Sequence, residues 1–445
     1  MSSQQIAVLG LGETGLSCVN FLLKQGQQVS VFDTRQSPPG EDKLNSCVNL
    51  IKGPLNGESL AQFDLLIASP GIALATPALQ FAAAQGCEII GDIELFAREL
   101  KKPAYAHAKL VTITGSNGKS TVTSLLGEMA VAADVKVGVG GNIGVPALDL
   151  LAPEVDLYVL ELSSFQLETT FSLQADIATI LNVSEDHMDR YQSYQHYTAA
   201  KHRIYEQSKM ALFNRDDKLT YPKNNAIKSV SFGFDQCYYG LISDANGEVF
   251  LATEGTPILP VRALKLSGKH NWMNALAAFA LGKAVGLGEA AMLTTLQQYS
   301  GLLHRCEFVA EINNVRWIND SKATNVGATQ AALAGLSETI KGDVHVILGG
   351  AGKGADFSEL SAVLNEIQGA IICFGADGDK IAKQNPRSQL VKDLDQAVAT
   401  IFQVAKPGDL VILSPACASL DMYKNFMARG DHFKSLVKTL AAGKS

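Results

Sequence analysis

The sequence predicts an α/β protein of three domains: a Rossmann-like N-terminal domain, a central P-loop ATPase-type domain with a mostly parallel sheet, and a C-terminal Rossmann-like domain. Three observations lead to this prediction. Short apolar runs alternate with helical patterns along most of the chain, which is typical of parallel sheets covered by helices. Two glycine-rich turns, at 10–15 and 115–121, each lie between a strand-like run and a helical pattern. A length of 445 residues corresponds to about three domains of ordinary size.

Composition is typical of a globular protein of the cytoplasm. Hydrophobic residues make up 47% of the chain, and the net charge of −7 argues against a nucleic-acid partner, which requires a concentrated basic surface. The start of the chain lacks a signal-peptide pattern, and no uninterrupted apolar stretch approaches the length of a membrane span. The seven cysteines contain no C-x-x-C pair, so we expect reduced core residues, Cys417 among them. We therefore expect a cytoplasmic protein without nucleic-acid or membrane partners, and we take it to be a monomer.

The first domain is expected at residues 1–97. Its first strand-like run leads into Gly10-x-Gly12-x-x-Gly15, the spacing of a dinucleotide-binding turn. Its second run ends in Asp33, where such folds place a ribose-binding acid. Taken alone, this segment predicts a dehydrogenase. The expected strands are 5–10, 28–33, 63–69 and 87–90, and a polar stretch at 97–109 is interpreted as a linker.

The second domain, expected at 98–302, begins with a loop suited to phosphates. The stretch "GSNGKST" follows the β-branched strand "LVTIT" and precedes a helix with apolar residues at helical spacing, from Val122 to Met129. Backbone N–H groups at a helix N-terminus converge on phosphate oxygens, and a lysine there reaches the terminal phosphates. Ile113 stands where a strict Walker A pattern requires glycine. The predicted phosphate-binding residues are Gly115, Ser116, Asn117, Gly118, Lys119, Ser120, which also offers a hydroxyl to Mg²⁺, and Thr121.

Three more residues of this domain are candidates for chemistry. Glu161 ends the strand-like run "YVLE", at the edge of a parallel sheet where a magnesium-binding acid is expected. His187 follows the next run, where a loop histidine is ordinarily a surface or capping residue, and Mg²⁺ prefers oxygen ligands. Lys201 falls on a helical pattern, and its ordinary interpretation is a solvated lysine on a helix face.

The rest of the chain continues the α/β pattern. A β-rich excursion is expected at 229–266, followed by helices from about 270 to 299. The third domain, expected at 303–445, begins with a hairpin that turns at Asn313–Asn314. It continues with the strand runs "VHVILGG", "AIICFGADG" and "DLVILSPA", each followed by a helical pattern.

A series of motifs across the chain resembles the Mur ligases. These motifs are "TITGSNGKST", "LELSSFQLE", "NVSEDHMDR", "KLSGKHNWMNALAA", "GLLHR", "WINDSKATN" and "SPACASLDMYKNF", in this order. The stretches "LGLGETGLS", "DTR", "ASPGIA" and "SPACASLD" are most similar to the D-glutamate-adding members. The resemblance implies an ATP-dependent amide ligase of peptidoglycan precursor synthesis. ATP would phosphorylate the L-alanyl carboxylate of UDP-N-acetylmuramoyl-L-alanine, and the amine of D-glutamate would attack the resulting acyl phosphate.

The resemblance also implies which residues contact each ligand. The first glycine turn would hold the UDP end of the substrate and no redox cofactor, with Glu13 beside it pointing outward. The metal and catalytic set would hold a pair of Mg²⁺ ions through Ser120, Glu161, His187 and Lys201, the last as a carbamylated lysine; Lys119 completes the catalytic residues. The UDP-substrate residues would be Thr14, Asp33, Thr34, Arg35, Ser69, Gly71 and Asn142.

Further residues would bind ATP and the amino acid. ATP would contact Asn271, Asn274, His304, Arg305, Asp320 and Lys322 in addition to the phosphate loop. D-glutamate would contact His187, Thr324, Lys353, Ser419 and Phe426. Ala351 stands where this family suggests an acid, so the loop around Lys353 departs from the pattern.

Three alternatives remain open at this point. An NAD(P)-dependent oxidoreductase would use the N-terminal turn but leave the second phosphate loop and Glu161 without a role. A catalytically silent, nucleotide-gated binding protein would not need Lys119, Glu161 and Lys201. A sister ligase would add glutamate to folate, or another amino acid to a muramyl peptide.

Overall fold

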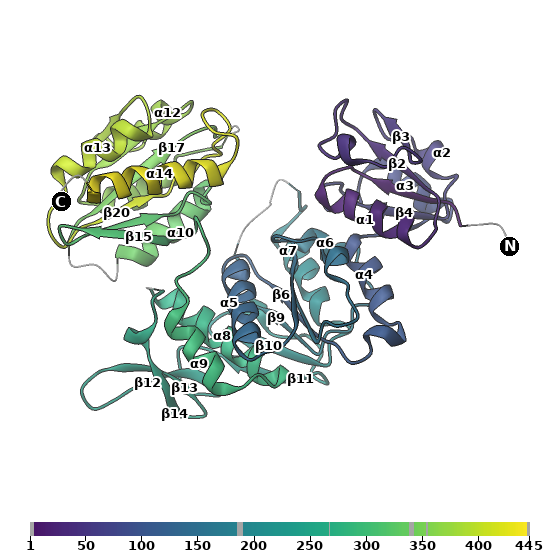
Figure 1. Cartoon of the computed structure of the whole chain (residues 1–445), viewed down its shortest axis with the longest axis horizontal. Helices are drawn as coiled ribbons and strands as arrows, with labels where there is room; N and C mark the ends of the chain where they lie inside the picture. Colours follow the sequence, from purple (N-terminus) through teal and green to yellow (C-terminus); the bar gives the residue numbers. More distant parts are fainter. Residues whose placement is uncertain (1–3, 185–189, 267, 338–341, 353–354, 443–445) are drawn as a thin grey trace. The chain divides into compact units, whose positions relative to one another are not determined.

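The computed structural model describes residues 4–184, 190–266, 268–337, 342–352 and 355–442. They form three β-sheets with helices packed on them (Figure 1), which confirms the predicted α/β class. The chain divides into two compact units, Met1–Ala263 with Met273–Gln297, and Leu264–Trp272 with Gln298–Ser445. The first unit contains two of the sheets, and the boundaries 1–97, 98–302 and 303–445 stay predictions.

The first sheet has five strands in the order β3-β2-β1-β4-β5, all parallel. The four predicted strands are present, and each central one is an apolar run that is buried on both faces. The prediction missed β3, because this edge strand is largely exposed and carries no apolar run. The strands are β1 (Ile6–Leu9), β2 (Val29–Asp33), β3 (Asn49–Lys52), β4 (Leu65–Ala68) and β5 (Glu88–Ile90). The helices are α1 (Glu13–Lys24), α2 (Gly57–Leu60), α3 (Pro77–Ala84) and α4 (Asp92–Leu100), with 3₁₀ turns at Glu41–Lys43 and Pro103–Tyr105.

The turn between β1 and α1 depends on its glycines. Gly10 has a φ of +89°, a conformation that side chains other than glycine's rarely adopt. A Cβ at Gly15 would lie 1.9 Å from the carbonyl oxygen of Gly10. The close approach therefore requires glycine, and it brings the N-terminus of α1 to the carboxyl end of the sheet.

The second sheet has nine strands in the order β14-β13-β12-β11-β10-β9-β6-β8-β7. Strands β6 to β11 are paired in parallel with their neighbours, whereas β12, β13 and β14 form an antiparallel extension that matches the predicted β-rich excursion. The parallel strands are β6 (Lys109–Thr114), β7 (Val137–Gly141), β8 (Leu157–Glu161), β9 (Ile177–Ile180), β10 (Met210–Asn214) and β11 (Lys228–Phe232). The extension is β12 (Tyr239–Ser243), β13 (Val249–Thr253) and β14 (Thr256–Pro260).

Two helices, α5 (Lys119–Ala132) and α6 (Ser164–Glu168), begin at the carboxyl edge of the parallel strands of this sheet. The helix α5 starts at the end of the phosphate loop. Ser163 and Gln166 form a capping box at the start of α6, directly after β8. The remaining helices are α7 (Tyr194–His202), α8 (Lys269–Val285) and α9 (Glu289–Gln298), with 3₁₀ turns at Ala147–Leu150, Arg203–Tyr205, Lys218–Thr220 and Val261–Ala263.

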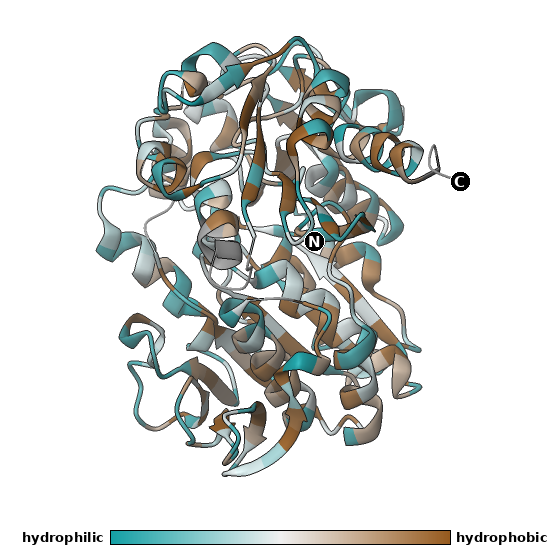
Figure 2. Ribbon diagram, turned by 90° about the vertical axis from the view of Figure 1, so that its left-hand side faces the viewer, coloured by the Kyte–Doolittle hydropathy of each residue, from teal (hydrophilic) through white to brown (hydrophobic). Residues whose placement is uncertain are grey.

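The third sheet has six strands in the order β15-β16-β20-β17-β18-β19. The predicted hairpin joins the antiparallel pair β15–β16, and its turn residues Asn313 and Asn314 have φ values of +53° and +61°, as a tight hairpin requires. Figure 2 shows the strands largely in the colours of hydrophobic residues and many helix faces in those of hydrophilic ones. The strands are β15 (Glu307–Ile312), β16 (Val315–Asn319), β17 (Val344–Gly349), β18 (Ile371–Phe374), β19 (Ser388–Leu390) and β20 (Leu410–Leu413). The helices are α10 (Val326–Ser337), α11 (Leu360–Glu366), α12 (Gly378–Ala382), α13 (Leu394–Val404) and α14 (Phe426–Ala442).

The cysteines only partly follow the prediction of reduced core residues. All seven are free, and Cys417 is buried, where desolvation raises its pKa to about 12. Cys47 and Cys237, however, are exposed, because they lie in polar turns that composition alone does not reveal. Among the described helices, none is long and apolar enough to cross a membrane.

Two acids of α4 fix the segment that follows β8. Asp92 Oδ2 accepts a hydrogen bond from Gln166 Nε2 at 3.0 Å. Glu94 Oε2 accepts the backbone N–H groups of Phe171 and Ser172, each at 2.8 Å. Asp92 is only 2% exposed, and burial raises its pKa to about 6. Within the first unit, α4 therefore holds α6 and the loop after it in place.

Asp92 predicts a pH dependence of stability. The folded-state pKa of Asp92, about 6, lies above its ordinary value of 3.8. The protonated side chain therefore contributes to the stability of the folded protein. This contribution is fully present below pH 3.8 and is lost as the pH rises to about 6. We expect Asp92→Asn, which keeps an oxygen for Gln166, to gain on the order of 2 kcal/mol of unfolding free energy relative to the parent between about pH 4 and about pH 7.5. Denaturant unfolding of both proteins at the two pH values measures this difference. If the variant and the parent differed in unfolding free energy by the same amount at both pH values, the raised pKa of Asp92 would be contradicted.

Candidate active site

The first unit contains a pocket of about 560 Å³ at the carboxyl end of its first sheet. The glycine turn after β1, the end of β2 and the loop after β4 form most of its wall, and residues after β7 and on α6 complete it. Glu13 is exposed, as expected, but it also lines this pocket. The structure thus brings together every residue predicted to contact the UDP substrate: Thr14, Asp33, Thr34, Arg35, Ser69, Gly71 and Asn142.

The carboxylate of Asp33 is engaged within the protein. It accepts hydrogen bonds from the backbone N–H of Leu11 at 2.7 Å, and from Arg35 Nε at 2.8 Å and Nη2 at 2.6 Å. The Arg35 guanidinium lowers the pKa of Asp33 to about 2. Asp33 is 2% exposed, whereas the Arg35 side chain is 48% exposed. Asp33 therefore fixes the glycine turn and orients an arginine on the pocket wall, where a cation suits a diphosphate.

The phosphate loop lies at the carboxyl end of β6 and is braced by a residue that the sequence analysis did not single out. Asn182, after β9, accepts the backbone N–H of Asn117 through Oδ1 at 2.8 Å and donates back to the Asn117 carbonyl at 3.0 Å. Its own carbonyl accepts the N–H of Ser116 at 2.9 Å. The motif that contains Asn182 was visible, but its partner lies 65 residues earlier in the chain.

Lys119 and Ser120 occupy the positions expected of a nucleotide-binding loop. Lys119 is the first residue of α5, and its Nζ donates to the carbonyl oxygens of Gly115 at 2.7 Å and Ser116 at 3.0 Å. Ser120 is 5% exposed. A Cβ at Gly118 would lie 2.4 Å from Asn274 Oδ1, so α8 approaches the loop directly. Asn271, which is also predicted to contact ATP, is buried on the same helix.

Glu161 is connected to the pocket of the first unit through Asn142. It is the last residue of β8 and is 2% exposed. Its Oε1 accepts a hydrogen bond from Asn142 Nδ2 at 2.8 Å, and Asn142 lines the pocket. Its Oε2 is buried and has no hydrogen-bond partner among the described residues. A buried, partly satisfied carboxylate of this kind needs a cation or another donor.

Lys201 is not solvated, so the ordinary interpretation from the sequence is wrong. It is 2% exposed, because the face of α7 on which it lies packs against the phosphate loop and an aromatic ring. Its Nζ donates to the Gly115 carbonyl at 3.0 Å and lies 4.6 Å from the centroid of the Tyr197 ring. Lys201 is therefore part of the same loop environment as Lys119.

Two predicted residues, His187 and Lys353, lie outside the described residues. Within the described ranges, which omit 185–189, no group of three or more His, Cys, Asp or Glu side chains is arranged to hold a metal ion.

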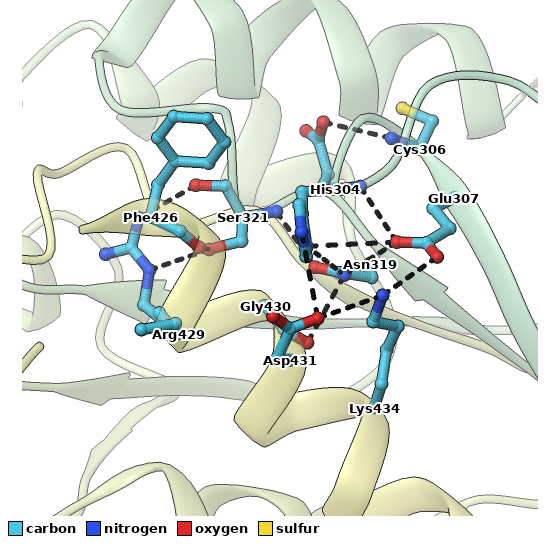
Figure 3. Close-up of polar contacts among 12 residues, drawn as sticks. His304, Cys306, Glu307, Asn319, Ser321, Phe426, Arg429, Gly430, Asp431 and Lys434 are labelled. Carbon is cyan, nitrogen blue, oxygen red and sulfur yellow. Dashed lines mark hydrogen bonds and ion pairs between the residues drawn. The ribbon is translucent and has the colours of Figure 1, made fainter. Parts of the chain in front are cut away.

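In the second unit, His304 is built into a polar cluster (Figure 3). Its Nδ1 lies 3.0 Å from Asn319 Nδ2, and its backbone N–H donates to Glu307 Oε2 at 2.8 Å. Because Asn319 donates to Nδ1, the ring proton sits on Nε2 when His304 is neutral, and burial lowers the His304 pKa. Lys434 completes the cluster with ion pairs to Glu307 at 3.2 Å and Asp431 at 3.1 Å. The hydrogen bonds with Asn319 and Glu307 fix His304 within this unit. It lies next in the chain to Arg305, which is also predicted to contact ATP.

Asp320 and the loops around it form the polar edge of the third sheet. Asp320 Oδ2 accepts from Ser414 Oγ at 2.8 Å, Oδ1 accepts the Cys306 N–H at 3.1 Å, and burial raises the Asp320 pKa to about 6. The backbones of Ala351 and Ala418 pair in both directions, at 2.8 and 3.0 Å. This pairing joins the loop after β17, where Ala351 departs from the family pattern, to the loop after β20, which carries Ser419. The other predicted residues here are Lys322, half-buried; Thr324, exposed; Ser419, buried; and Phe426, the first residue of α14.

Arg429 is a second residue that the sequence analysis missed. It is 0% exposed, and burial lowers its pKa to about 10. It donates to Ser321 Oγ at 3.0 Å and to the carbonyl oxygens of Ser321 at 2.9 Å, Cys417 at 3.0 Å and Gly349 at 3.3 Å. One guanidinium thus joins the end of β17 to the loops after β16 and β20; Figure 3 shows it beside Ser321. A helix-face arginine gives no sign of this from its spacing.

Comparison with known proteins assigns the chain to a family. Three family models match in order: the Mur ligase MurD-like N-terminal domain at 4–91, the Mur ligase middle domain at 113–282 and the Mur ligase glutamate ligase domain at 304–417. The UDP-N-acetylmuramoylalanine–D-glutamate ligases of Shigella boydii serotype 4 (strain Sb227) and Escherichia coli (strain K12) are each 54% identical over 440 residues, 98% of this chain and 98% of theirs. The solved UDP-N-acetylmuramate-alanine ligase MurC of Thermotoga maritima matches 99% of this chain and 100% of its own with a TM-score of 0.60 at 19% identity, and so supports the fold. This chain belongs to the Mur ligase family.

Proposed function

We propose that this chain is an ATP-dependent ligase that joins D-glutamate to UDP-N-acetylmuramoyl-L-alanine in peptidoglycan precursor synthesis. The names of the 54% identical relatives support the reaction. One structural observation carries the proposal: Asn142 lines the substrate pocket and also donates to Glu161 at the edge of the sheet that bears the phosphate loop. The end of a substrate bound in this pocket would thus lie next to the site of phosphoryl transfer.

The reaction needs two steps. The L-alanyl carboxylate attacks the γ-phosphorus of ATP, the bond to the ADP oxygen breaks, and an acyl phosphate forms. The amine of D-glutamate then attacks the acyl carbon, loses a proton, and expels phosphate as the amide forms. Lys119 and the loop N–H groups would neutralise the transferring phosphoryl group, since such reactions depend mainly on positioning and charge. Holding the two reactants together raises their effective concentration to about 10⁵ M or more.

The residues at this edge fit magnesium. Glu161 Oε2 is buried without a partner among the described residues, and the Ser120 hydroxyl is a second oxygen donor on the phosphate loop. We propose that Ser120, Glu161, His187 and carbamylated Lys201 hold two Mg²⁺ ions. The ions would supply positive charge to the phosphate oxygens. Carbamylation would join the Lys201 nitrogen to CO₂ with release of two protons from the ammonium group, and so replace a cation with a carboxylate.

The remaining ligand residues are proposed on the same basis. ATP would also contact Asn271, Asn274, His304, Arg305, Asp320 and Lys322. D-glutamate, with two carboxylates, would be bound by His187, Thr324, Lys353, Ser419 and Phe426. We further propose a cytoplasmic monomer, because ATP and UDP-linked precursors are cytoplasmic metabolites and one chain supplies all of these residues.

The alternatives have less support. An oxidoreductase would use the N-terminal glycine turn but leave the second phosphate loop and the buried Glu161 without a role. A silent binding protein would not need the buried Glu161 and Lys201 beside the phosphate loop. A sister ligase would share the fold, and only a substrate test separates it. Phosphate release should require ATP, Mg²⁺, UDP-N-acetylmuramoyl-L-alanine and D-glutamate together, with a product heavier by one glutamyl unit. Release that persists without D-glutamate, or with another amino acid in its place, would contradict the proposal.

Lys119→Ala should abolish turnover. Its Nζ is held over the loop by Gly115 and Ser116, so its loss removes charge from the phosphate site without disturbing the other pocket. We expect phosphate release to fall at least about 100-fold while affinity for the UDP substrate stays within about twofold. Lys209→Ala is the matched control, because Lys209 is 69% exposed and pairs with Asp176. Normal turnover by Lys119→Ala would remove the assignment of this loop to ATP.

Lys201→Ala should be weakly active and partly rescued by acetate or formate, which supply the oxygens that a carbamate would carry. Phosphate release with and without each salt measures the rescue, and Lys209→Ala should show none. Mass spectrometry of the native protein in bicarbonate provides a second readout through the added mass of CO₂. Full activity of Lys201→Ala without any salt would exclude the carbamate.

A further inference from the structure

Arg190 donates hydrogen bonds to the Ser69–Ile72 loop, which forms one wall of the substrate pocket. Its Nη1 donates to the carbonyl oxygen of Pro70 at 2.7 Å, and its Nη2 lies 3.4 Å from the carbonyl oxygen of Ile72. The side chain is 15% exposed and extends over the ring of Phe165, with 4.1 Å from the guanidinium carbon to the ring centroid. Its Nη2 also lies 3.4 Å from Glu168 Oε2. Arg190 is thus fixed on α6 while it reaches the loop.

The loop that Arg190 contacts is part of the pocket. The residues from Ser69 to Ile72 all line it. On the inner side, the Ser69 N–H donates to the Leu9 carbonyl at 2.9 Å and Ser69 Oγ donates to the Gly10 carbonyl at 3.2 Å. These bonds attach the start of the loop to the glycine turn. In the described chain, Arg190 is the side chain that donates to the carbonyls of Pro70 and Ile72, so it holds the far part of the loop.

The arginine fork suits this position. Two donors of one planar group reach the carbonyls of Pro70 and Ile72 and a carboxylate, and its face stacks on an aromatic ring. A lysine offers a single ammonium without the planar stack. The helix α6, on which Arg190 is fixed, begins three residues after Glu161. Arg190 therefore connects the wall of the pocket to the segment that carries the acid of the phosphate site.

We propose that Arg190 is a positioning residue for the UDP-linked substrate. It sets the affinity for this substrate by holding the Ser69–Ile72 loop in its binding geometry. Among the described residues, none of its contacts is with the phosphate loop, so affinity for ATP does not depend on it. The inference rests on the proposed function of the pocket as the site of the UDP substrate.

Arg203 offers a matched control within the same unit. Its Nε donates to the Leu167 carbonyl at 2.7 Å and its Nη2 to the Thr170 carbonyl at 2.8 Å. It lies over the ring of Phe171 at 5.1 Å. These contacts are of the same kind as those of Arg190, but they stabilise the end of α6 and none of the four residues lines the pocket.

The test compares Arg190→Ala and Arg190→Lys with Arg203→Ala and Arg203→Lys. Calorimetry without ATP gives the Kd of UDP and of UDP-N-acetylmuramoyl-L-alanine, and steady-state kinetics gives KM for each substrate and kcat. We expect Arg190→Ala to raise Kd and KM for the UDP-linked substrate about tenfold or more, Arg190→Lys to restore part of the affinity, and KM for ATP to stay within about twofold. The Arg203 variants should leave these Kd values within about twofold of the parent.

Two results would overturn the inference: an unchanged Kd in Arg190→Ala, or equal losses in the Arg190 and Arg203 variants, which would indicate a general loss of structure. If Arg190→Ala does not fold, the two lysine variants make the same comparison. A native protein that binds UDP but not the muramoyl nucleotide would contradict the proposed substrate instead. In that case the affinity of the Arg190 variants for UDP still decides the role of Arg190.

Discussion

Parallel strand pairing is the constraint on which the rest of this structure depends. Parallel strands all present their carboxyl ends at the same edge of a sheet, so the loops that follow them gather there. In the first sheet the strand ends and the loops after them carry the glycine turn, Asp33 and Ser69; in the second they carry the phosphate loop, Glu161 and Asn182. The third sheet gathers Asp320, Gly349 and Cys417 in the same way. Residues far apart in the chain become neighbours in this way, and no pattern in the sequence predicts which of them will meet.

The buried ionisable side chains at these three edges differ in the partners that surround them. Asp33 is neutralised by an arginine that reaches the pocket surface, and its pKa falls to about 2. Glu161 is only half satisfied, through Asn142, and leaves one oxygen without a described partner. Arg429 is surrounded by neutral oxygens, and its pKa falls to about 10. Buried charges that are incompletely paired are unfavourable for stability, and they are frequent where an ionic ligand completes the set.

The sequence predicted the fold well and the site in part. Apolar runs revealed β1, β4, β6 and β8, and the Asn313–Asn314 turn revealed the hairpin, because both signals are local. The edge strand β3 was missed, because an exposed strand leaves no apolar run. The pocket residues followed from the family resemblance, whereas the glycine spacing by itself favoured a dehydrogenase.

The residues that were missed share a physical reason. Helical spacing shows which face of a helix a residue occupies, but not what packs against that face, so Lys201 was interpreted as solvated. Asn182, Arg190 and Arg429 act through contacts with backbone atoms of distant segments. Such contacts depend on where the loops lie in space and not on the side chains of their partners. They therefore become visible only once the fold is known.

The contacts of Arg429 have a consequence for how the third sheet could vary in sequence. Three of its four acceptors are main-chain carbonyls, and those groups are the same whatever side chains the loops carry. Substitutions of Ser321 or Cys417 would therefore keep a carbonyl acceptor for the guanidinium, whereas Gly349 has a φ of +130° and a Cβ there would lie 1.8 Å from the Phe374 carbonyl oxygen. The attachment of these segments to Arg429 thus depends on the main chain and on one glycine. Most of the side chains that the segments carry can vary while the segments stay joined.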